Sequence, residues 1–231
     1  MSIFAIADLH LSGDPPQKPM DRFSPDWINH WEKIKLAWQA SVRPDDTVLI
    51  AGDTSWALKW PEAKKDLSAI ASLPGRKVIV RGNHDYWWGT IGKMQKELPD
   101  AFFFLHNNFY FSEGWAICGS RGWVTPDDPM FLPEDEPIYQ REAIRVRTSL
   151  NAARAAGHTR ILLMLHYPPV YQLDDSNSFT ELITEFSVEY CVFGHIHGNG
   201  THMAPEGDLK GATCHLVACD ALNFTVKEII Q

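Results

Sequence analysis

Short, nearly continuous apolar runs recur along the chain and alternate with longer amphipathic segments. Three of these runs, Val48–Ala51, Val78–Val80 and Ile161–Leu165, are apolar at every position. Such runs are typical of strands that are buried on both faces of a sheet. Together with weaker runs, the pattern predicts strands over Ser2–Ala7, Thr47–Ala51, Lys77–Arg81, Ala101–Leu105, Trp115–Gly119, Arg160–Leu165, Tyr190–Phe193, Cys214–Ala218 and Phe224–Ile229.

Between the runs, apolar residues recur at helical spacing. This spacing predicts helices over Asp26–Ala40, Pro61–Leu73, Thr90–Leu98 and Ile138–Ala156. The first helix carries an apolar stripe made of Trp27, Trp31, Ile34 and Trp38. Because this spacing follows one face of a helix, the stripe favours core packing over a ligand-binding box. The alternation of strands and helices, with more strands late in the chain, indicates the α/β class.

Two stretches lack either pattern and are predicted to be loops. Ser12–Ser24 is rich in Pro, Asp and Gly, and Arg121–Pro137 contains three prolines before its acidic end. Long loops without their own secondary structure often form the rim of a functional site, although a solvated surface loop is equally compatible with this composition.

Length and charge narrow the class of protein. A chain of 231 residues with 45% hydrophobic residues suits a single domain over residues 1–231 with a sizeable core. The net charge of −8 gives a long polyanion no electrostatic help, so nucleic acid is not the expected partner. A small phosphate ester could still bind if metal ions supply local positive charge.

The N-terminus and the cysteines indicate in which cellular compartment the protein is expected. The first residues lack the basic start of a signal peptide, and no apolar run approaches the ~18 residues of a membrane span. None of the four cysteines forms a Cys-x-x-Cys pair, so we expect buried, reduced thiols at Cys118, Cys191, Cys214 and Cys219. These features predict a cytoplasmic protein with no membrane segment.

Metal-ligating side chains follow five of the apolar runs. They occur in the segments Asp8-Leu9-His10, Gly52-Asp53, Gly82-Asn83-His84-Asp85, His166 and Gly194-His195-Ile196-His197. Carboxylate, amide and imidazole groups are ligands for first-row divalent metals, and these are enough for two ions. A lone Asp or His at a strand end is usually a cap or a core group whose hydrogen bonds are satisfied. Here that explanation would have to hold at five separate places, so the full set favours a metal site.

The expected geometry follows from the strand ends. Side chains at positions i and i+2 of a strand share one face, so Asp8 and His10 could reach one ion, as could His195 and His197. Gly194 would let the backbone bend tightly before the second pair. Binding crevices of open α/β sheets lie beyond the carboxyl ends of the strands, where all five segments are predicted to lie.

The order of these segments resembles that of the calcineurin-like metallophosphoesterase superfamily, over residues 8–197. The resemblance implies an α/β fold, a four-layer α/β/β/α sandwich of two mixed β-sheets. It implies that Asp53 bridges two divalent or trivalent ions, with Mn²⁺ or Fe expected and Zn²⁺ possible. The implied ligands of the first ion are Asp8, His10, Asp53 and His197, and those of the second are Asp53, Asn83, His166 and His195.

The resemblance also implies a hydrolytic mechanism. A hydroxide that bridges the ions would attack phosphorus in line with the leaving alcohol. His84 resembles the family histidine that protonates or stabilises the leaving oxygen. Asp85, the next residue, would orient and charge His84. The alternative for Asp85 is a helix cap before Tyr86, and the two roles are compatible.

Substrate contacts are less sharply indicated. Arg81 precedes the Gly-Asn-His-Asp segment and either touches substrate or is a surface group. The aromatic residues near the motifs form either a wall against a substrate ring or ordinary core packing. The candidates are Trp56, Trp87 and Trp123.

The chain departs from two branches of the superfamily. Protein serine/threonine phosphatases carry Gly-Asp-x-x-Asp-Arg-Gly, whereas here Asp53 is followed by Thr-Ser-Trp-Ala-Leu, without the second acid and the arginine. Purple acid phosphatases have a tyrosine ligand where Trp56 stands here. The resemblance therefore predicts a metal-dependent phosphoric ester hydrolase, with a phosphodiester, such as a nucleotide-like one, favoured over a monoester. The alternatives are a non-catalytic protein-binding scaffold and a metal sensor on the same fold, and the substrate, the metals and the oligomeric state stay open.

Overall fold

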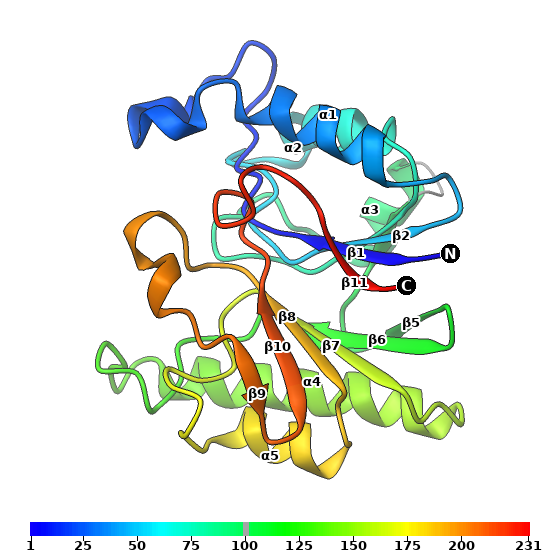
Figure 1. Cartoon of the computed structure of the whole chain (residues 1–231), viewed down its shortest axis with the longest axis vertical. Coiled ribbons are helices and arrows are strands. Elements are labelled where there is room, and N and C mark those ends of the chain that lie inside the picture. Colours follow the sequence, from blue (N-terminus) through cyan, green and yellow to red (C-terminus); the bar gives the residue numbers. More distant parts are fainter. Residues whose placement is uncertain (99–101) are drawn as a thin grey trace.

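Two mixed sheets stack face to face, and helices cover both outer faces (Figure 1). The computed structural model describes residues 1–98 and 102–231. The first sheet has the order β11-β1-β2-β3-β4, with β11 antiparallel to β1 and the other neighbours parallel. Its strands are β1 (Ile3–Ile6), β2 (Thr47–Ile50), β3 (Arg76–Ile79), β4 (Phe102–Phe104) and β11 (Lys227–Ile230).

The second sheet has the order β5-β6-β7-β8-β10-β9, with parallel strands in the middle and an antiparallel strand at each edge. Its strands are β5 (Phe109–Ser112), β6 (Trp115–Ser120), β7 (Ile161–Leu165), β8 (Tyr190–Phe193), β9 (Gly207–Leu209) and β10 (Ala212–Leu216). Both sheets are mixed, as the four-layer sandwich requires.

The helices divide between the two outer faces (Figure 1). The first sheet is covered by α1 (His30–Ser41), α2 (Trp60–Ala71) and α3 (Ile91–Glu97), and the second by α4 (Glu136–Ala155) and α5 (Ser178–Glu185). Three short 3₁₀ turns lie in loops, namely η1 (Met20–Arg22), η2 (Pro25–Trp27) and η3 (Gly198–Met203). Among the described residues, no helix combines the length and the apolar character needed to cross a membrane.

Apolar side chains form three layers, one between the sheets and one beneath the helices on each side. Alternate residues of β1 illustrate the arrangement, because Ile3 and Ala5 lie between the sheets while Phe4 and Ile6 face α1 and α2. A strand with both faces covered buries every side chain, which explains the continuous apolar runs. The expected α/β/β/α sandwich is therefore confirmed.

Most predicted elements are present, with shifted ends. Ala101, the first residue of one predicted strand, lies outside the described residues. The predicted first helix begins four residues late, at His30, because residues 25–27 form a 3₁₀ turn and Asn29 has a left-handed backbone (φ 55°). The last strand likewise begins only at Lys227, because Phe224 has a positive φ of 60°, which a strand does not accommodate.

Three elements were not predicted from the pattern. The strands β5 and β9 are short edge strands of the second sheet; β5 (Phe-Tyr-Phe-Ser) is only partly buried, and β9 (Gly-Asp-Leu) has a single large apolar residue. Helix α5 has eight residues and follows an Asn177 capping box, in which the Asn177 side chain accepts from the backbone of Thr180. The four cysteines are free and buried, as expected.

Candidate metal centre

The predicted ligands lie in the loops that follow the carboxyl ends of strands from both sheets. Asp8, Asp53 and Asn83 follow β1, β2 and β3 of the first sheet. His166 and His195 follow β7 and β8 of the second. The crevice predicted at the carboxyl edge therefore lies between two sheets, and each contributes side chains to it.

Asn83 is the centre of one group of side chains. Its Oδ1 lies 2.6 Å from His166 Nε2 and 3.0 Å from His195 Nδ1. His166 Nε2 also lies 3.5 Å from Asp53 Oδ2. His166 Nδ1 lies 2.9 Å from the Ala51 carbonyl oxygen, so a proton on Nδ1 leaves Nε2 as the free acceptor. The structure thus brings together the four side chains expected around the second ion.

The other group of side chains also contacts Asp53. His10 Nε2 lies 3.9 Å from Asp53 Oδ2, and the ring centroids of His10 and His197 are 5.4 Å apart. Asp8, Asp53 and His166 each offer one ligand atom, and these atoms lie within 4.8 Å of one another. Asp53 therefore lies between the two groups, in the position that a bridging ligand requires.

Several buried atoms of this cluster have no hydrogen-bond partner. Asp8 is 0% exposed and His10 is 1% exposed, yet Asp8 Oδ1 and both ring nitrogens of His10 are unpartnered. Leaving a buried polar group unsatisfied costs ~1–3 kcal/mol. Carboxylate oxygen and imidazole nitrogen together form a donor set that a divalent metal ion satisfies, so these residues fit a metal.

Burial changes the protonation of the cluster. Burial, together with the nearby Asp53 carboxylate, raises the pKa of Asp8, and burial raises the pKa of Asp53 to about 6. Burial lowers the pKa of His10, and it lowers the pKa of His166 to about 3. The imidazoles of His10 and His166 are thus held in the neutral form that binds metals. Asp8 and Asp53 each accept a backbone hydrogen bond, from His195 and His84, but burial outweighs it.

Four proposed ligands have a backbone conformation that is rare for residues other than glycine. Positive φ angles occur at Asp8 (58°), His10 (46°), Asp53 (50°) and His195 (69°). Each such residue costs about 1–3 kcal/mol unless its surroundings hold it, and residues of this kind cluster at functional sites. Here the backbone is held by hydrogen bonds that the amides of Asp8 and His10 donate to the carbonyls of Gly52 (3.0 Å) and Asp53 (3.0 Å).

The alternation expected for Asp-x-His at a strand end is therefore wrong. Strand β1 ends at Ile6, before both ligands, and β8 ends at Phe193. Asp8 and His10 converge because the chain adopts the left-handed conformation twice, not because a strand alternates. The prediction failed because a side-chain period of two holds only while the backbone stays extended.

Two glycines make room for the carboxylates. A Cβ on Gly82 would lie 2.1 Å from Asp53 Oδ1, and a Cβ on Gly194 would lie 2.6 Å from Asp8 Oδ2. At the second position it is His195, not Gly194, that has the left-handed φ. The expected role of Gly194 as a flexible bend is therefore corrected, since this position requires space and not conformational freedom.

His84 lies beside the cluster without joining it. Its backbone amide donates to Asp53 Oδ1 (2.8 Å), and its ring centroid lies 4.3 Å from that of Trp56 and 5.8 Å from that of His10. The ring atom Nδ1 is buried and unpartnered. The imidazole thus lies beside the proposed ligands, and its ring makes no described hydrogen bond to any of them.

Asp85 has different partners from those expected. Its carboxylate accepts hydrogen bonds from the backbone amides of Thr54 (2.9 Å), Ser55 (3.2 Å) and Gly82 (2.7 Å) and from the Trp87 indole (3.0 Å). None of its described hydrogen bonds involves the His84 ring, and the next helix begins only at Ile91, so it caps no helix. Asp85 ties the loop after β2 to the loop after β3, and burial with the nearby Asp53 carboxylate raises its pKa to about 7.

The tryptophans predicted as substrate contacts occupy different environments. Trp56 is half-buried and stacks on His10, with ring centroids 4.8 Å apart and planes at 20°. Trp87 is only 3% exposed and belongs to the core beneath α2 and α3, so we no longer propose it as a substrate contact. Trp123 is half-buried, donates its indole NH to Asp135 (2.9 Å), and packs with its ring centroid 5.1 Å from that of Tyr167.

Arg81 is half-buried beside the cluster. Its Nε is buried without a partner, and it lines a small cavity together with Arg121, Arg145 and Glu142. Glu142 is 0% exposed and pairs with Arg121 (3.3 Å) and Arg145 (2.6 Å). Arg81 therefore lies beside a structural ion-pair network, and no described hydrogen bond ties it to a proposed ligand.

One contact was missed from the sequence. The Tyr167 ring lies over His195, with centroids 4.0 Å apart, although only 6% of Tyr167 is exposed. Its position directly after His166 was the available signal, but a single adjacent tyrosine has no distinctive pattern.

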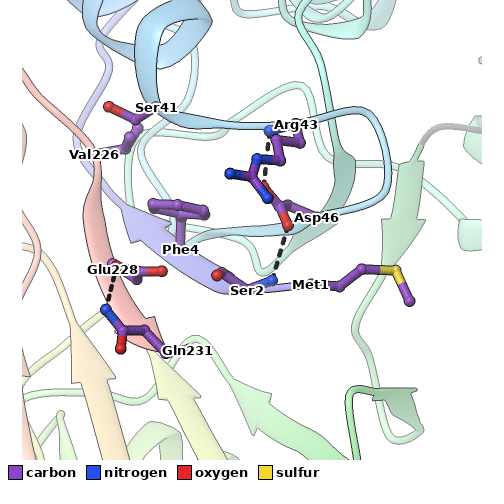
Figure 2. A pocket seen from close by; sticks show the side chains of 9 residues that line it. All are labelled: Met1, Ser2, Phe4, Ser41, Arg43, Asp46, Val226, Glu228 and Gln231. Carbon is purple, nitrogen blue, oxygen red and sulfur yellow. Dashed lines mark hydrogen bonds between the residues drawn. The ribbon is translucent and has the colours of Figure 1, made fainter.

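The cavity in Figure 2 is unrelated to this centre. It has a volume of about 480 Å³ and lies at the amino ends of β1 and β2, at the edge opposite the proposed ligands. The Asp46 carboxylate within it accepts from the amides of Ser2 and Arg43, both at 2.8 Å (Figure 2). This carboxylate holds the start of β2 in place, and none of the predicted site residues lines the cavity.

The chain is similar to several known structures. It matches the protein of unknown function AQ665 from Aquifex aeolicus (17% identity, 98% of this chain and 95% of that chain, TM-score 0.54) and TT1561 of Thermus thermophilus (12%, 99% and 97%, TM-score 0.63). It also matches the phosphopantetheinyl hydrolase PptH from Mycobacterium tuberculosis (14%, 99% and 95%, TM-score 0.55). At these identities the likeness concerns the fold.

Sequence comparison gives the family. No protein of curated function matches the chain significantly. The sequence model described as calcineurin-like phosphoesterase matches residues 1–199, which include all the proposed ligands. The chain therefore belongs to the calcineurin-like phosphoesterase family.

Proposed function

We propose that this chain is a metal-dependent phosphoric ester hydrolase that prefers phosphodiesters to phosphomonoesters. The observation that carries the proposal is the buried cluster in which ligand atoms of Asp8, Asp53 and His166 lie within 4.8 Å of one another. Its unpartnered oxygen and nitrogen atoms support occupancy by metal ions.

The two groups of side chains around Asp53 support two ions. Asp8, His10, Asp53 and His197 would hold one, and Asp53, Asn83, His166 and His195 the other. When bound, the ions supply an acidified water and positive charge for the phosphate oxygens. The mixture of nitrogen and oxygen donors suits Mn²⁺ or Fe, with Zn²⁺ as a further possibility.

The chain's own residues complete the chemistry. His84 would donate a proton to the leaving oxygen, because its imidazole adjoins the cluster and its Nδ1 has no described hydrogen-bond partner. Asp85 would act as a positioning residue, since its carboxylate fixes the loops that carry Asp53 and Asn83. We retain Trp56 and Trp123 as proposed contacts for the organic part of the substrate, and Arg81 as a weaker one.

Two separate cavities near the centre support a diester, which has two organic groups. One cavity, of about 280 Å³, is lined by His195 and His197, and another, of about 270 Å³, is lined by Trp56, whose ring stacks on His10.

A hydrolysis assay tests the proposal. Mn²⁺-loaded protein is compared on bis(p-nitrophenyl) phosphate and p-nitrophenyl phosphate, with elemental analysis of the same sample. We expect metal-dependent turnover of both esters, with the larger kcat/KM for the diester. A larger value for the monoester would overturn the preference for diesters. If a sample that retains two ions turns over neither ester, the hydrolase proposal is wrong, and a scaffold or a metal sensor is favoured.

Composition supports a small substrate and a reducing compartment. The net charge of −8 disfavours a long nucleic acid, so we propose a small phosphate ester as the partner. The four buried thiols are unlinked, which supports a cytoplasmic location.

A further inference from the structure

A cavity of about 280 Å³ adjoins the candidate metal centre on the side of His195 and His197. Three loops form it, those that follow the neighbouring strands β6, β7 and β8. Six of the thirteen described residues that line it are aliphatic or sulfur-containing, namely Val124, Pro168, Val170, Ile196, Met203 and Pro205. Whatever ester is held at the metal centre would therefore have an apolar chamber beside its phosphate.

Aromatic and exposed side chains shape this chamber. The ring of Tyr167 packs against His195 and so joins the cavity wall to the metal centre. Tyr171 and Met203 are 39% and 65% exposed, so they border the solvent. Large apolar side chains that border both a cavity and solvent are typical of ligand sites.

Polar groups other than the proposed metal ligands His195 and His197 are limited in the chamber. Apart from the hydroxyls of Tyr167 and Tyr171, only Thr125 and Asp128 contribute them among the described lining residues, and Asp128 Oδ1 already accepts from the backbone amide of Met130 (2.7 Å). No lysine or arginine occurs among the described residues that line it. The chamber therefore offers little to a charged or heavily hydroxylated group, which would lose its hydrogen bonds to water on entering.

The walls are held in place before any ligand binds. Asp127, in the loop after β6, accepts from the backbone amide of Tyr171 (2.6 Å) and from Asn177 Nδ2 (2.7 Å). Asn177 Nδ2 also donates to the Pro169 carbonyl (2.9 Å). These bonds tie the loop after β6 to the loop after β7, so binding would require little ordering of the walls.

We propose that this chamber binds one organic group of the phosphate ester, and that this group is an apolar ring such as a phenyl group rather than a nucleoside. The inference rests on the proposed function, because the phosphate must lie at the metal centre for its substituent to reach the chamber. Stacking against tyrosine and contact with aliphatic side chains favour a flat apolar ring. A base with its ribose would leave polar groups without partners there.

Binding of phosphonates, which the hydrolase cannot cleave at carbon, tests the inference directly. Calorimetry with Mn²⁺-loaded protein compares phenylphosphonate, methylphosphonate and the methylene phosphonate analogue of AMP. Burial of the ring should make phenylphosphonate bind about tenfold more tightly than methylphosphonate. We expect the AMP analogue to show no comparable gain over methylphosphonate.

The outcomes separate the two proposals. Equal affinities for phenyl- and methylphosphonate, or tightest binding of the AMP analogue, overturn the inference about the ring and leave the proposed function intact. If no phosphonate binds in a metal-dependent manner, the proposed function fails, and the inference that rests on it fails with it.

A pair of variants locates the binding site. Val124→Asp places a carboxylate in the chamber, whereas Met130→Asp adds the same charge to the same loop at a residue that is 77% exposed and does not line the chamber. The ratio of phenyl- to methylphosphonate affinity should fall to about one in Val124→Asp and stay unchanged in Met130→Asp. Because both phosphonates are anions, a general repulsion by the added carboxylate lowers both affinities and cancels in their ratio.

A second variant covers the case in which half-buried Val124 does not tolerate the change. Met203→Asp alters an exposed side chain at the mouth of the chamber, so folding should be preserved. We expect it to lower the same ratio severalfold. Survival of the phenyl preference in every folded variant of the chamber would overturn the inference.

Discussion

Asp53 is the residue on which the candidate centre depends most. Its Oδ2 faces His10 on one side and His166 on the other, and its Oδ1 accepts from the His84 amide. It therefore has side-chain contacts to a histidine of each group of ligands. A carboxylate has two oxygens and a negative charge, which an amide in the same place cannot supply.

Asp53→Asn should therefore abolish both metal binding and hydrolysis. The substituted amide preserves the size of the side chain but removes the charge that two cations require. Elemental analysis and Mn²⁺-dependent hydrolysis measure the two effects. Asp45→Asn is the matched control, because Asp45 is an exposed acid just before β2, at the opposite end of the strand from Asp53. An Asp53→Asn protein that retains two ions would contradict the bridging role.

His84→Ala should separate catalysis from metal binding. The His84 imidazole adjoins the cluster, but its backbone amide makes the one hydrogen bond described between this residue and a proposed ligand. We expect the variant to keep its metal content while kcat falls ~10²–10⁴-fold, the usual effect of losing a general acid. Parallel elemental analysis is the control, and loss of both ions would show that His84 is a ligand instead.

At the scale of elements, the loops that follow the strands carry the chemistry and the strands and helices hold them. One contact within this framework involves a charge, since Lys77 of β3 is only 1% exposed. Its ammonium donates to the carbonyls of Leu73 and Ala71 at the end of α2, the latter at 3.4 Å. A buried lysine thus supplies hydrogen bonds that the end of this helix lacks.

The stability contribution of Lys77 should depend on pH. Burial lowers its pKa to about 8 from 10.5. Between these values the unfolded chain binds the proton more strongly than the folded protein, so stability rises with pH in this window. We expect the free energy of unfolding of the wild type to increase relative to Lys77→Met between pH 7 and pH 10. Urea unfolding at both values measures the difference, and a difference that is independent of pH would contradict the lowered pKa.

At the scale of the whole molecule, the two sheets share both a core layer and the candidate centre. Ala5 and Leu49 of the first sheet pack with Ile117 and Leu162 of the second in the layer between them. The proposed ligands likewise come from both sheets. We therefore propose that residues 1–231 form one domain, in which bound metal would join the two halves.

Metal binding should accordingly stabilise the whole chain. A ligand at a hundredfold excess over its Kd adds about 2.7 kcal/mol, which corresponds to a Tm increase of several degrees for a chain of this length. Calorimetry with Mn²⁺ and with EDTA measures this change, and we expect a single transition in both samples. The Asp53→Asn protein should show no increase. Two separate transitions, with only one moved by Mn²⁺, would contradict the single domain.

Local patterns predicted much of the fold. Continuous apolar runs such as Ile161–Leu165 required strands covered on both faces, because only that arrangement buries every side chain. The edge strands β5 and β9 were not predicted in this way, because they are short, are not buried along their whole length, and are held at the sheet edges by pairing with β6 and β10.

In the candidate site, too, some features were predictable from local sequence and others depend on tertiary contacts. The sequence by itself determined which residue types follow the strands, and the family resemblance ordered them into two groups around Asp53. Only the tertiary structure decided how Asp8 and His10 converge through left-handed backbone, that Asp85 ties two loops together, and that Trp87 belongs to the core. Periodicity describes a chain while it stays regular, whereas these features arise where it leaves the strands, and there contacts between distant segments set the geometry.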